Sequence, residues 1–343
     1  MSVVLTILAS IFIFGLIIFI HELGHFIAAK KSKITVNEFS LGMGPRLFGF
    51  TKGETKYNLR LLPIGGFVAM EGEDEESDKP GAFNKAPVWN RIWVVASGAI
   101  MNLILGFIVV LALTCSMELL GTRTIGGFAE NAATEASGLQ VDDTIVAING
   151  RKTYLITDIQ YEIARIRDGS ADITVKRGGE EITLDDVKFD TAVAEDGTET
   201  IVFDMIFYGV KPTFGTVMTY SFRWTLSIAK LVVSSLVDLV TGSADVSQLS
   251  GPVGIVTVVG QAAQDSFFSV LMLLAFISIN LGIFNILPLP ALDGGRLIFL
   301  LFEAITKKKL DSKYESLVNV IGFVLLMLLM VFVTYNDITR LVK

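Results

Sequence analysis

Apolar residues along the chain fall into four long runs, with segments of other character between them. The runs cover Val3–Ile20, Ile92–Met117, Phe267–Leu287 and Leu317–Val333. Each is long enough to cross the roughly 30 Å hydrocarbon core of a bilayer as a helix. The pattern predicts a polytopic α-helical membrane protein with four transmembrane helices.

The segment after the first run has a different pattern. Short alternating pieces at Phe39–Phe50 and Tyr57–Met70 are interrupted by Pro63 and by the pair Gly65-Gly66, which is typical of a β-hairpin. Because the hairpin is too apolar for a free loop, we expect it to associate with the membrane. An exposed strand edge there could bind an extended peptide, or the hairpin could simply fill the helix bundle.

Residues 121–210 are predicted to form one soluble, β-rich domain. Strand-like pieces at Asp143–Ile148, Asp172–Lys176 and Glu181–Val187 accompany an Asn149-Gly150 turn and a helix at Thr157–Asp168. Beyond the domain, Tyr220–Val240 has apolar residues at helical spacing interrupted by charges, which favours an amphipathic helix lying on the outer membrane face. The predicted parts are therefore 1–120 (membrane), 121–210 (soluble), 211–264 (amphipathic, extracytoplasmic) and 265–343 (membrane).

Basic residues indicate the orientation. Lys30, Lys31 and Lys33 follow the first run, and Lys307–Lys309 follow the third. The positive-inside rule places both clusters in the cytoplasm and both termini, with the soluble domain, outside. A cleavable signal peptide is disfavoured because the lysines follow the apolar run instead of preceding it.

Composition excludes several functional classes. With 52% hydrophobic and 18% charged residues and a mean hydropathy of +0.60, the chain is too apolar for an ordinary soluble protein. Residues 121–220 carry 17 acidic against 9 basic residues, which argues against nucleic acid or anionic lipid as a partner of that segment. The single cysteine, Cys115, allows no internal disulfide, and its place in an apolar segment argues against thiol catalysis.

The candidate chemistry begins at His21-Glu22-Leu23-Gly24-His25, which contains both histidines of the chain. Residues four apart on a helix share a face, so His21 and His25 can bind one metal ion. Zinc held this way lowers the pKa of bound water to about 7, and Glu22 beside it can act as general base. A chance match is the alternative, but ionisable groups at membrane depth are costly and usually functional.

A second candidate segment is residues 285–296, where Pro288 and Pro290 must interrupt the helix. A carboxylate beside broken backbone at membrane depth needs a partner, and a metal ion is the natural one. Asp293 is therefore the expected third ligand, with an open fourth position for water. Glu303 and Glu118 are competing acids, but both lie near the ends of spans, where solvent would satisfy them.

Taken together, these motifs resemble the site-2 protease family, in its bacterial RseP-type branch. The similar features are HELGH, the hairpin, the stretch 251–255, the stretch 285–296, and a sequence from Ser137 to Gly150 that looks like a bacterial PDZ domain. The resemblance covers essentially the whole chain. Two positions depart from the family pattern: Ala99 replaces a usual proline and Asp142 a usual glycine. There is one PDZ-like domain where some members have two.

The resemblance implies an intramembrane zinc protease of the bacterial inner membrane, with its active site toward the cytoplasmic side. His21, His25 and Asp293 would bind Zn²⁺, and Glu22 would be catalytic. Asn285 would bind substrate or stabilise the oxyanion, and Gly65, Gly66 and Phe67 belong to the substrate-binding strand.

The expected partners are membrane lipid and single-span membrane proteins, such as anti-sigma factors or remnant signal peptides, shortened beforehand by a site-1-type protease. Nucleic acid is not an expected partner. The PDZ-like domain would act as a size filter or bind a new C-terminus near residues 126–128.

Two other classes remain as hypotheses. A membrane adaptor with structural zinc would have no use for Glu22. A metal transporter would need further ligands across the bilayer, and the chain has no other histidine.

Overall fold

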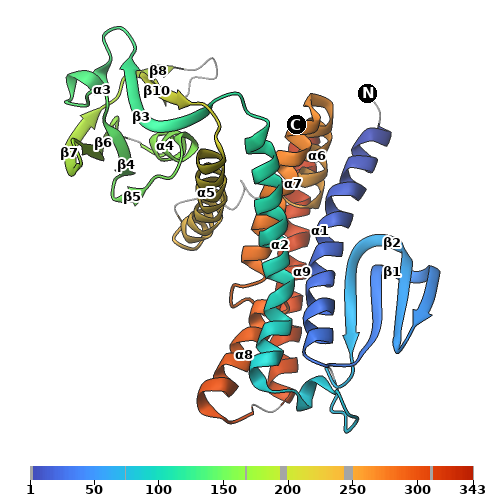
Figure 1. Ribbon diagram of the computed structural model, residues 1–343. Coiled ribbons are helices and arrows are strands. Elements are labelled where there is room, and N and C mark those ends of the chain that lie inside the picture. Colours follow the sequence, from blue (N-terminus) through green and yellow to red (C-terminus); the bar gives the residue numbers. More distant parts are fainter. Residues whose placement is uncertain are drawn as a thin grey trace. The chain divides into compact units, whose positions relative to one another are not determined.

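The computed structural model describes residues 3–73, 75–166, 168–193, 199–242, 250–309 and 312–342 (Figure 1). These residues form two compact units. The first combines residues 1–109 with 232–343, and the second contains residues 110–231. The candidate chemistry of the sequence lies in the first unit.

Four of the described helices are long and apolar enough to cross a membrane. They are α1 (Val3–Lys31), α2 (Val88–Cys115), α7 (Phe267–Phe284) and α9 (Ser312–Val342). Each overlaps one of the four apolar runs, so four long apolar helices are confirmed. The side of the membrane on which each helix ends stays a prediction.

Two further helices lie in the first unit: α6 (Pro252–Asp265) and α8 (Asp293–Thr306). Proline is tolerated in the first turn of a helix, so Pro252 begins α6. The Asp337 carboxylate on α9 accepts hydrogen bonds from the N–H groups of Gly251 and Gly254, at 3.2 and 2.8 Å. Stretch 251–255 thus starts a helix that packs against α1, α7 and α9.

The predicted hairpin consists of β1 (Val36–Lys52) and β2 (Thr55–Met70). Both strands bend, so residues 36–41 pair with residues 66–70 on one side, and residues 38–41 also pair with residues 56–59 on the other. The ring of Phe26 on α1 lies 5.4 Å from that of Phe39 and 5.9 Å from that of Tyr57, which holds the hairpin against α1.

The outer part of the hairpin exposes large apolar side chains: Met43, Leu47, Phe48, Phe50, Leu59, Leu61 and Leu62. An apolar surface of this kind marks contact with a membrane or another protein. It accords with the expected membrane association of the hairpin. In Figure 1 the hairpin lies alongside α1.

The second unit is built on a sheet in the order β10-β3-β4-β6-β7, with β5 paired to β4. Its strands are β3 (Leu120–Phe128), β4 (Thr144–Ile148), β5 (Arg151–Lys152), β6 (Ser170–Arg177), β7 (Glu180–Lys188) and β10 (Met205–Val210), and a separate pair is formed by β8 (Thr191–Val193) and β9 (Glu199–Ile201). The short helix α3 (Ala133–Ala136) and helix α4 (Ile156–Ile163) complete the fold.

Two sequence details of this unit have a structural counterpart. Asn149 and Gly150 both adopt positive φ, 47° and 72°, as a two-residue hairpin turn requires. Asp142 also has a positive φ of 72°. Asp tolerates this conformation better than most residues, which is why it can replace glycine there.

The long helix α5 (Phe214–Val240) begins six residues before the predicted amphipathic helix. Polar contacts hold its middle against α4. Ser227 Oγ donates to the Asp158 carboxylate at 2.5 Å, and Lys230 Nζ donates to the Glu162 carboxylate at 2.7 Å. Asp158 and Glu162 are buried, so these contacts satisfy charges that would otherwise be costly.

Candidate metal centre and active site

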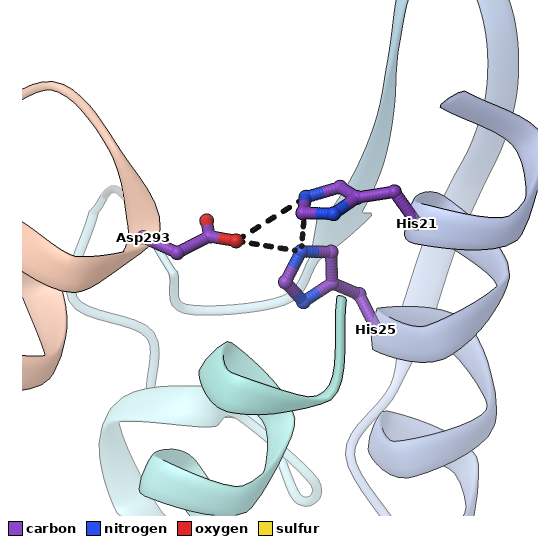
Figure 2. Close-up of side chains that lie close together, drawn as sticks. All are labelled: His21, His25 and Asp293. Atoms are coloured by element: carbon purple, nitrogen blue, oxygen red, sulfur yellow. Dashed lines mark hydrogen bonds and ion pairs between the residues drawn. The ribbon is translucent and has the colours of Figure 1, made fainter. Parts of the chain in front are cut away.

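His21 and His25 lie one turn apart on α1, and their rings face the same space (Figure 2). Their Nε2 atoms are 3.1 Å apart. Imidazole groups four residues apart on a helix commonly bind one metal ion. The two histidines therefore offer a pair of donor atoms at one point.

Asp293 supplies a third donor atom from the first turn of α8. Its Oδ2 lies 3.2 Å from His21 Nε2 and 3.3 Å from His25 Nε2, and Figure 2 shows the three side chains converging. Oδ2 is buried and has no hydrogen-bond partner among the described residues. Two imidazole nitrogens and a carboxylate oxygen are ligands that zinc and similar cations prefer.

The loop from residue 285 to residue 292 directs Asp293 into the site. Helix α7 ends at Phe284, because Pro288 and Pro290 cannot continue it. A Cβ on Gly294 would overlap the carbonyl of Leu287, and one on Gly295 would lie 2.7 Å from the Leu289 carbonyl oxygen. The two glycines thus allow the start of α8 to pack directly against this loop.

The second nitrogen of each histidine ring, Nδ1, also has a polar neighbour. His25 Nδ1 lies 2.9 Å from the Val94 carbonyl oxygen and can donate to it. This hydrogen bond keeps the proton on Nδ1 and leaves Nε2 free as a donor to a metal ion. A ligand orientation of this type is found in most metal sites that use histidine.

His21 has Asn102 of α2 as its neighbour. Asn102 Nδ2 lies 3.3 Å from His21 Nδ1, and Asn102 Oδ1 is buried with no hydrogen-bond partner among the described residues. Rotating the side-chain amide of Asn102 by half a turn would exchange its oxygen and nitrogen. Asn102 Oδ1 would then accept a hydrogen bond from His21 Nδ1–H. That arrangement satisfies both groups and again leaves Nε2 for a metal ion.

Glycine residues allow α2 to approach the motif closely. A Cβ on Gly98 would lie 2.7 Å from Cε1 of both His21 and His25, and a Cβ on Gly24 would lie 2.9 Å from Met101 Cγ. Gly98 and Asn102 lie within the apolar run Ile92–Met117. Their spacing of four residues places them on one face of α2, which is the signal that could have linked them to the site.

Glu22 stands beside the three donor atoms. It shares a cavity of about 210 Å³ with His21, His25 and Asp293, and Gly66 and Phe67 of β2 line the same cavity. A Cβ on Gly66 would lie 2.8 Å from Glu22 Cγ. The strand edge at residues 66–70 therefore passes next to this carboxylate. Gly65 does not line the cavity and has a φ of 75°.

Two ion pairs hold α8 in place near the site. Arg296 Nη1 lies 2.5 Å from Glu73 Oε1, which ties α8 to the segment after β2. Arg91 on α2 contacts both carboxylate oxygens of Glu303, at 3.0 and 2.6 Å. Glu303 was a competing candidate for the third metal ligand in the sequence. Its carboxylate instead forms an ion pair with Arg91.

Neither Glu118 nor Asn285 belongs to the group of three donor atoms. Glu118 is exposed after the end of α2. Asn285 is buried at the C-terminal end of α7 and is not among the residues that line the cavity around Glu22. Its role in substrate binding stays a prediction.

Comparison with known proteins places the chain among proteases. The model of Peptidase family M50 matches residues 9–329. A Clostridium acetobutylicum protein with a provisional zinc metalloprotease name is 38% identical, covering 97% of each chain. The regulator of sigma-W protease RasP of Bacillus subtilis is 33% identical, covering 98% of this chain and 99% of its own. The zinc metalloprotease RasP of Bacillus licheniformis is 34% identical over the same shares.

These matches extend over both compact units and include every residue of the site described above. The chain therefore belongs to peptidase family M50, the site-2 protease family.

Proposed function

We propose that this protein is an intramembrane zinc metalloprotease that cuts single-span membrane proteins within or near their transmembrane segment. The observation that carries the proposal is the convergence of His21, His25 and Asp293 next to a non-ligand carboxylate, Glu22, in a cavity bordered by a strand edge. A structural metal site would need neither Glu22 nor the strand edge.

The three donor atoms fit zinc. They all lie within 4.8 Å of one another, their side chains are 13%, 12% and 25% exposed, and Asp293 Oδ2 itself is buried. Zinc bound there supplies Lewis-acid chemistry, acidifying water and polarising the scissile carbonyl. His21, His25 and Asp293 would hold it, with Val94 and Asn102 orienting the rings.

Glu22 acts as general base and then as general acid. Its carboxylate accepts the proton of the attacking water and returns a proton to the departing amine of the cleaved bond. The edge of β2 at Gly66 and Phe67 positions the substrate, because main-chain hydrogen bonds hold a peptide in extended form beside Glu22. Asn285 is proposed to bind substrate or stabilise the oxyanion after rearrangement of the loop that it begins.

The proposed topology places Lys30, Lys31, Lys33 and Lys307–Lys309 in the cytoplasm, with both termini and the second unit outside. The second unit is proposed to be a PDZ-like domain that acts as a size filter. Residues 126–128, the candidate site for a substrate C-terminus, lie on β3, and Gly127 and Phe128 pair with β10. That pairing leaves less of this backbone open to a ligand, which favours the filter.

The proposed substrates are anti-sigma factors or remnant signal peptides, shortened first by a site-1-type protease. The name of the Bacillus subtilis relative, a regulator of sigma-W protease, supports a role in sigma-factor control. The charge of the second unit, acidic overall, gives no support to nucleic acid as a partner.

The test uses the purified full chain and a single-span protein tagged at both ends. We expect cuts inside the apolar segment, located by the masses of the products. Two Ala→Gly changes in that segment should raise the rate about tenfold or more, since each glycine weakens a helix by about 1 kcal/mol and so exposes peptide bonds. Cuts confined to the soluble flanks would contradict intramembrane proteolysis.

Asn102→Ala should weaken zinc binding about 10- to 100-fold, the usual effect of losing the hydrogen-bond partner of a histidine ligand. Affinity would be measured by competition with a chromophoric chelator. Asn102→Asp is the matched variant, because its carboxylate still accepts from His21 Nδ1–H, and it should restore most of the affinity. Equal zinc affinity in Asn102→Ala and the wild type would show that Asn102 does not orient His21.

A further inference from the structure

The second unit contains a cavity of about 440 Å³ far along the sequence from the candidate metal ligands. It lies between the start of β3, the end of β10 and the first turns of α5. Its walls carry six hydroxyl groups, from Thr122, Tyr154, Thr213, Thr216, Thr219 and Tyr220. The Thr122 hydroxyl already donates to the Tyr208 carbonyl oxygen, at 2.9 Å, and the Thr213 and Thr216 hydroxyls contact each other, at 3.0 Å. The hydroxyl groups of Tyr154, Thr219 and Tyr220 can donate to a polar ligand.

The only charged residues among those lining the cavity are Arg123 and Arg223. Arg123 Nη1 donates to the carbonyl oxygens of Ile145 and Thr153, at 3.2 and 2.5 Å, which leaves Nε and Nη2 available. Burial and the neighbouring Arg223 both lower the pKa of the Arg123 guanidinium. Two cations thus face one cavity without a carboxylate between them.

Asp158 offsets part of this positive charge but does not line the cavity. Asp158 interacts electrostatically with Arg123, but its carboxylate already accepts from the N–H groups of Tyr154 and Leu155, at 2.6 and 2.9 Å, and from the Ser227 hydroxyl. Residues 121–220 are acidic overall, which argued against anionic lipid as a partner. The structure instead brings Arg123 of this region and Arg223, just beyond it, to one cavity that has no acidic lining residue.

The chain keeps the cavity close to the end of a membrane span. Leu120 follows Cys115, the last residue of α2, by five positions, an extended reach of at most about 18 Å. Helix α5 also exposes apolar side chains, with Phe214 at 86% and Phe222 at 59%. Exposed aromatic residues beside hydroxyl groups and arginines are typical of a helix at the lipid headgroup level.

We propose that this cavity binds the phosphate group of an anionic phospholipid, with the guanidinium groups of Arg123 and Arg223 on the phosphate oxygens. Arginine donates paired hydrogen bonds to phosphate, and basic pockets near membrane spans suit lipid headgroups. The acyl chains would lie along the exposed apolar side of α5, at Phe214 and Phe222. The bound lipid would fix the start of α5 at the membrane surface.

Trp224 is the natural probe, because its ring lies 6.0 Å from that of Tyr220, which lines the cavity. In the full chain with Trp89→Phe and Trp93→Phe, Trp224 fluorescence would be measured in nanodiscs containing phosphatidylglycerol or phosphatidylcholine with brominated acyl chains. We expect stronger quenching by the anionic lipid, with an apparent preference of about fivefold for each arginine.

Arg223→Gln should lower the preference for the anionic lipid by at least about fivefold, the contribution of one arginine. Arg223 is exposed and has no hydrogen bond or ion pair among the described residues, so the fold should tolerate the change. Lys176→Gln is the control, since it removes one charge from an exposed side chain on β6 of the same unit. It should keep the preference of the wild type.

Equal quenching by the two lipids in the wild type, or a preference that Arg223→Gln leaves unchanged, would overturn the proposal. A second arm distinguishes a lipid from a free phosphate. Soluble glycerol phosphate would be titrated into the full chain in neutral detergent. A saturable, Arg223-dependent response of Trp224 without any preference between the lipids would assign the cavity to free phosphate and overturn the lipid assignment.

Discussion

Glu22→Gln should abolish cleavage, lowering the rate by about 1,000-fold, because general-base catalysis contributes about 10²- to 10⁴-fold. Glutamine has the size and shape of glutamate but cannot accept the proton of the attacking water. Zinc content should stay at the wild-type level, because the three converging donor atoms belong to His21, His25 and Asp293. The measurement is the cleavage rate of a tagged single-span protein in detergent, with zinc determined in the same samples.

The matched control is Glu54→Gln, which makes the same chemical change at an exposed turn. Glu54 contacts Lys30 at 2.6 Å, and an exposed pair of this kind contributes little to stability. Its cleavage rate should therefore match that of the wild type. Retained cleavage in Glu22→Gln would contradict the role of Glu22 as general base, and loss of zinc would show that Glu22 is itself a ligand.

The parts of the site with local signals were accessible from the sequence. The spacing of His21 and His25 fixes their common face on any helix, whatever surrounds it. Asp293 was predicted as the third ligand for a different reason. A carboxylate at membrane depth, beside the helix break at Pro288 and Pro290, is costly without a partner. The structure places all three together, although they come from opposite ends of the chain. Their roles as ligands stay predictions until zinc binding is measured.

The residues around the metal ligands are positioned by contacts between segments far apart in the chain. No short sequence pattern therefore identified them. Asn102 lies on an apolar helix like many packing residues, and only the approach of α1 brings it to His21. Helix α6 was missed for a similar reason. The N–H groups of Gly251 and Gly254 at its start are satisfied by Asp337, which is far away in sequence.

In the hairpin, too, the strands had a local sequence signal and their pairing did not. Alternation of apolar residues and the Gly65-Gly66 pair predicted strands near the observed positions. The register was not predictable, because residues 38–41 pair with two segments of β2 at once. Gly66 pairs with Leu41 of β1 and lies against Glu22 of α1, so the position of the proposed substrate strand follows from the tertiary structure.

Asp293→Ala should lower zinc affinity by more than about 100-fold, since even an outer partner of a ligand is worth about 10- to 100-fold. Two imidazole nitrogens would remain, too few for a stable zinc site. Cleavage should be lost together with the metal, in contrast to Glu22→Gln. The measurement is zinc per chain after dialysis against a weak chelator, with circular dichroism to verify that the helices persist.

Glu118→Ala is the informative control, because Glu118 was a competing acid in the sequence and is exposed in the structure. It should retain zinc and cleavage. Asp293→Asn adds a graded test: its amide oxygen occupies nearly the same place without the negative charge, so affinity should fall between those of the wild type and the alanine variant. Unchanged zinc content in Asp293→Ala would move the third ligand to another residue. That outcome would also remove the reason for Oδ2 to lie 3.2 and 3.3 Å from two imidazole nitrogens, because three acceptor atoms at such distances repel unless a cation or a proton lies between them.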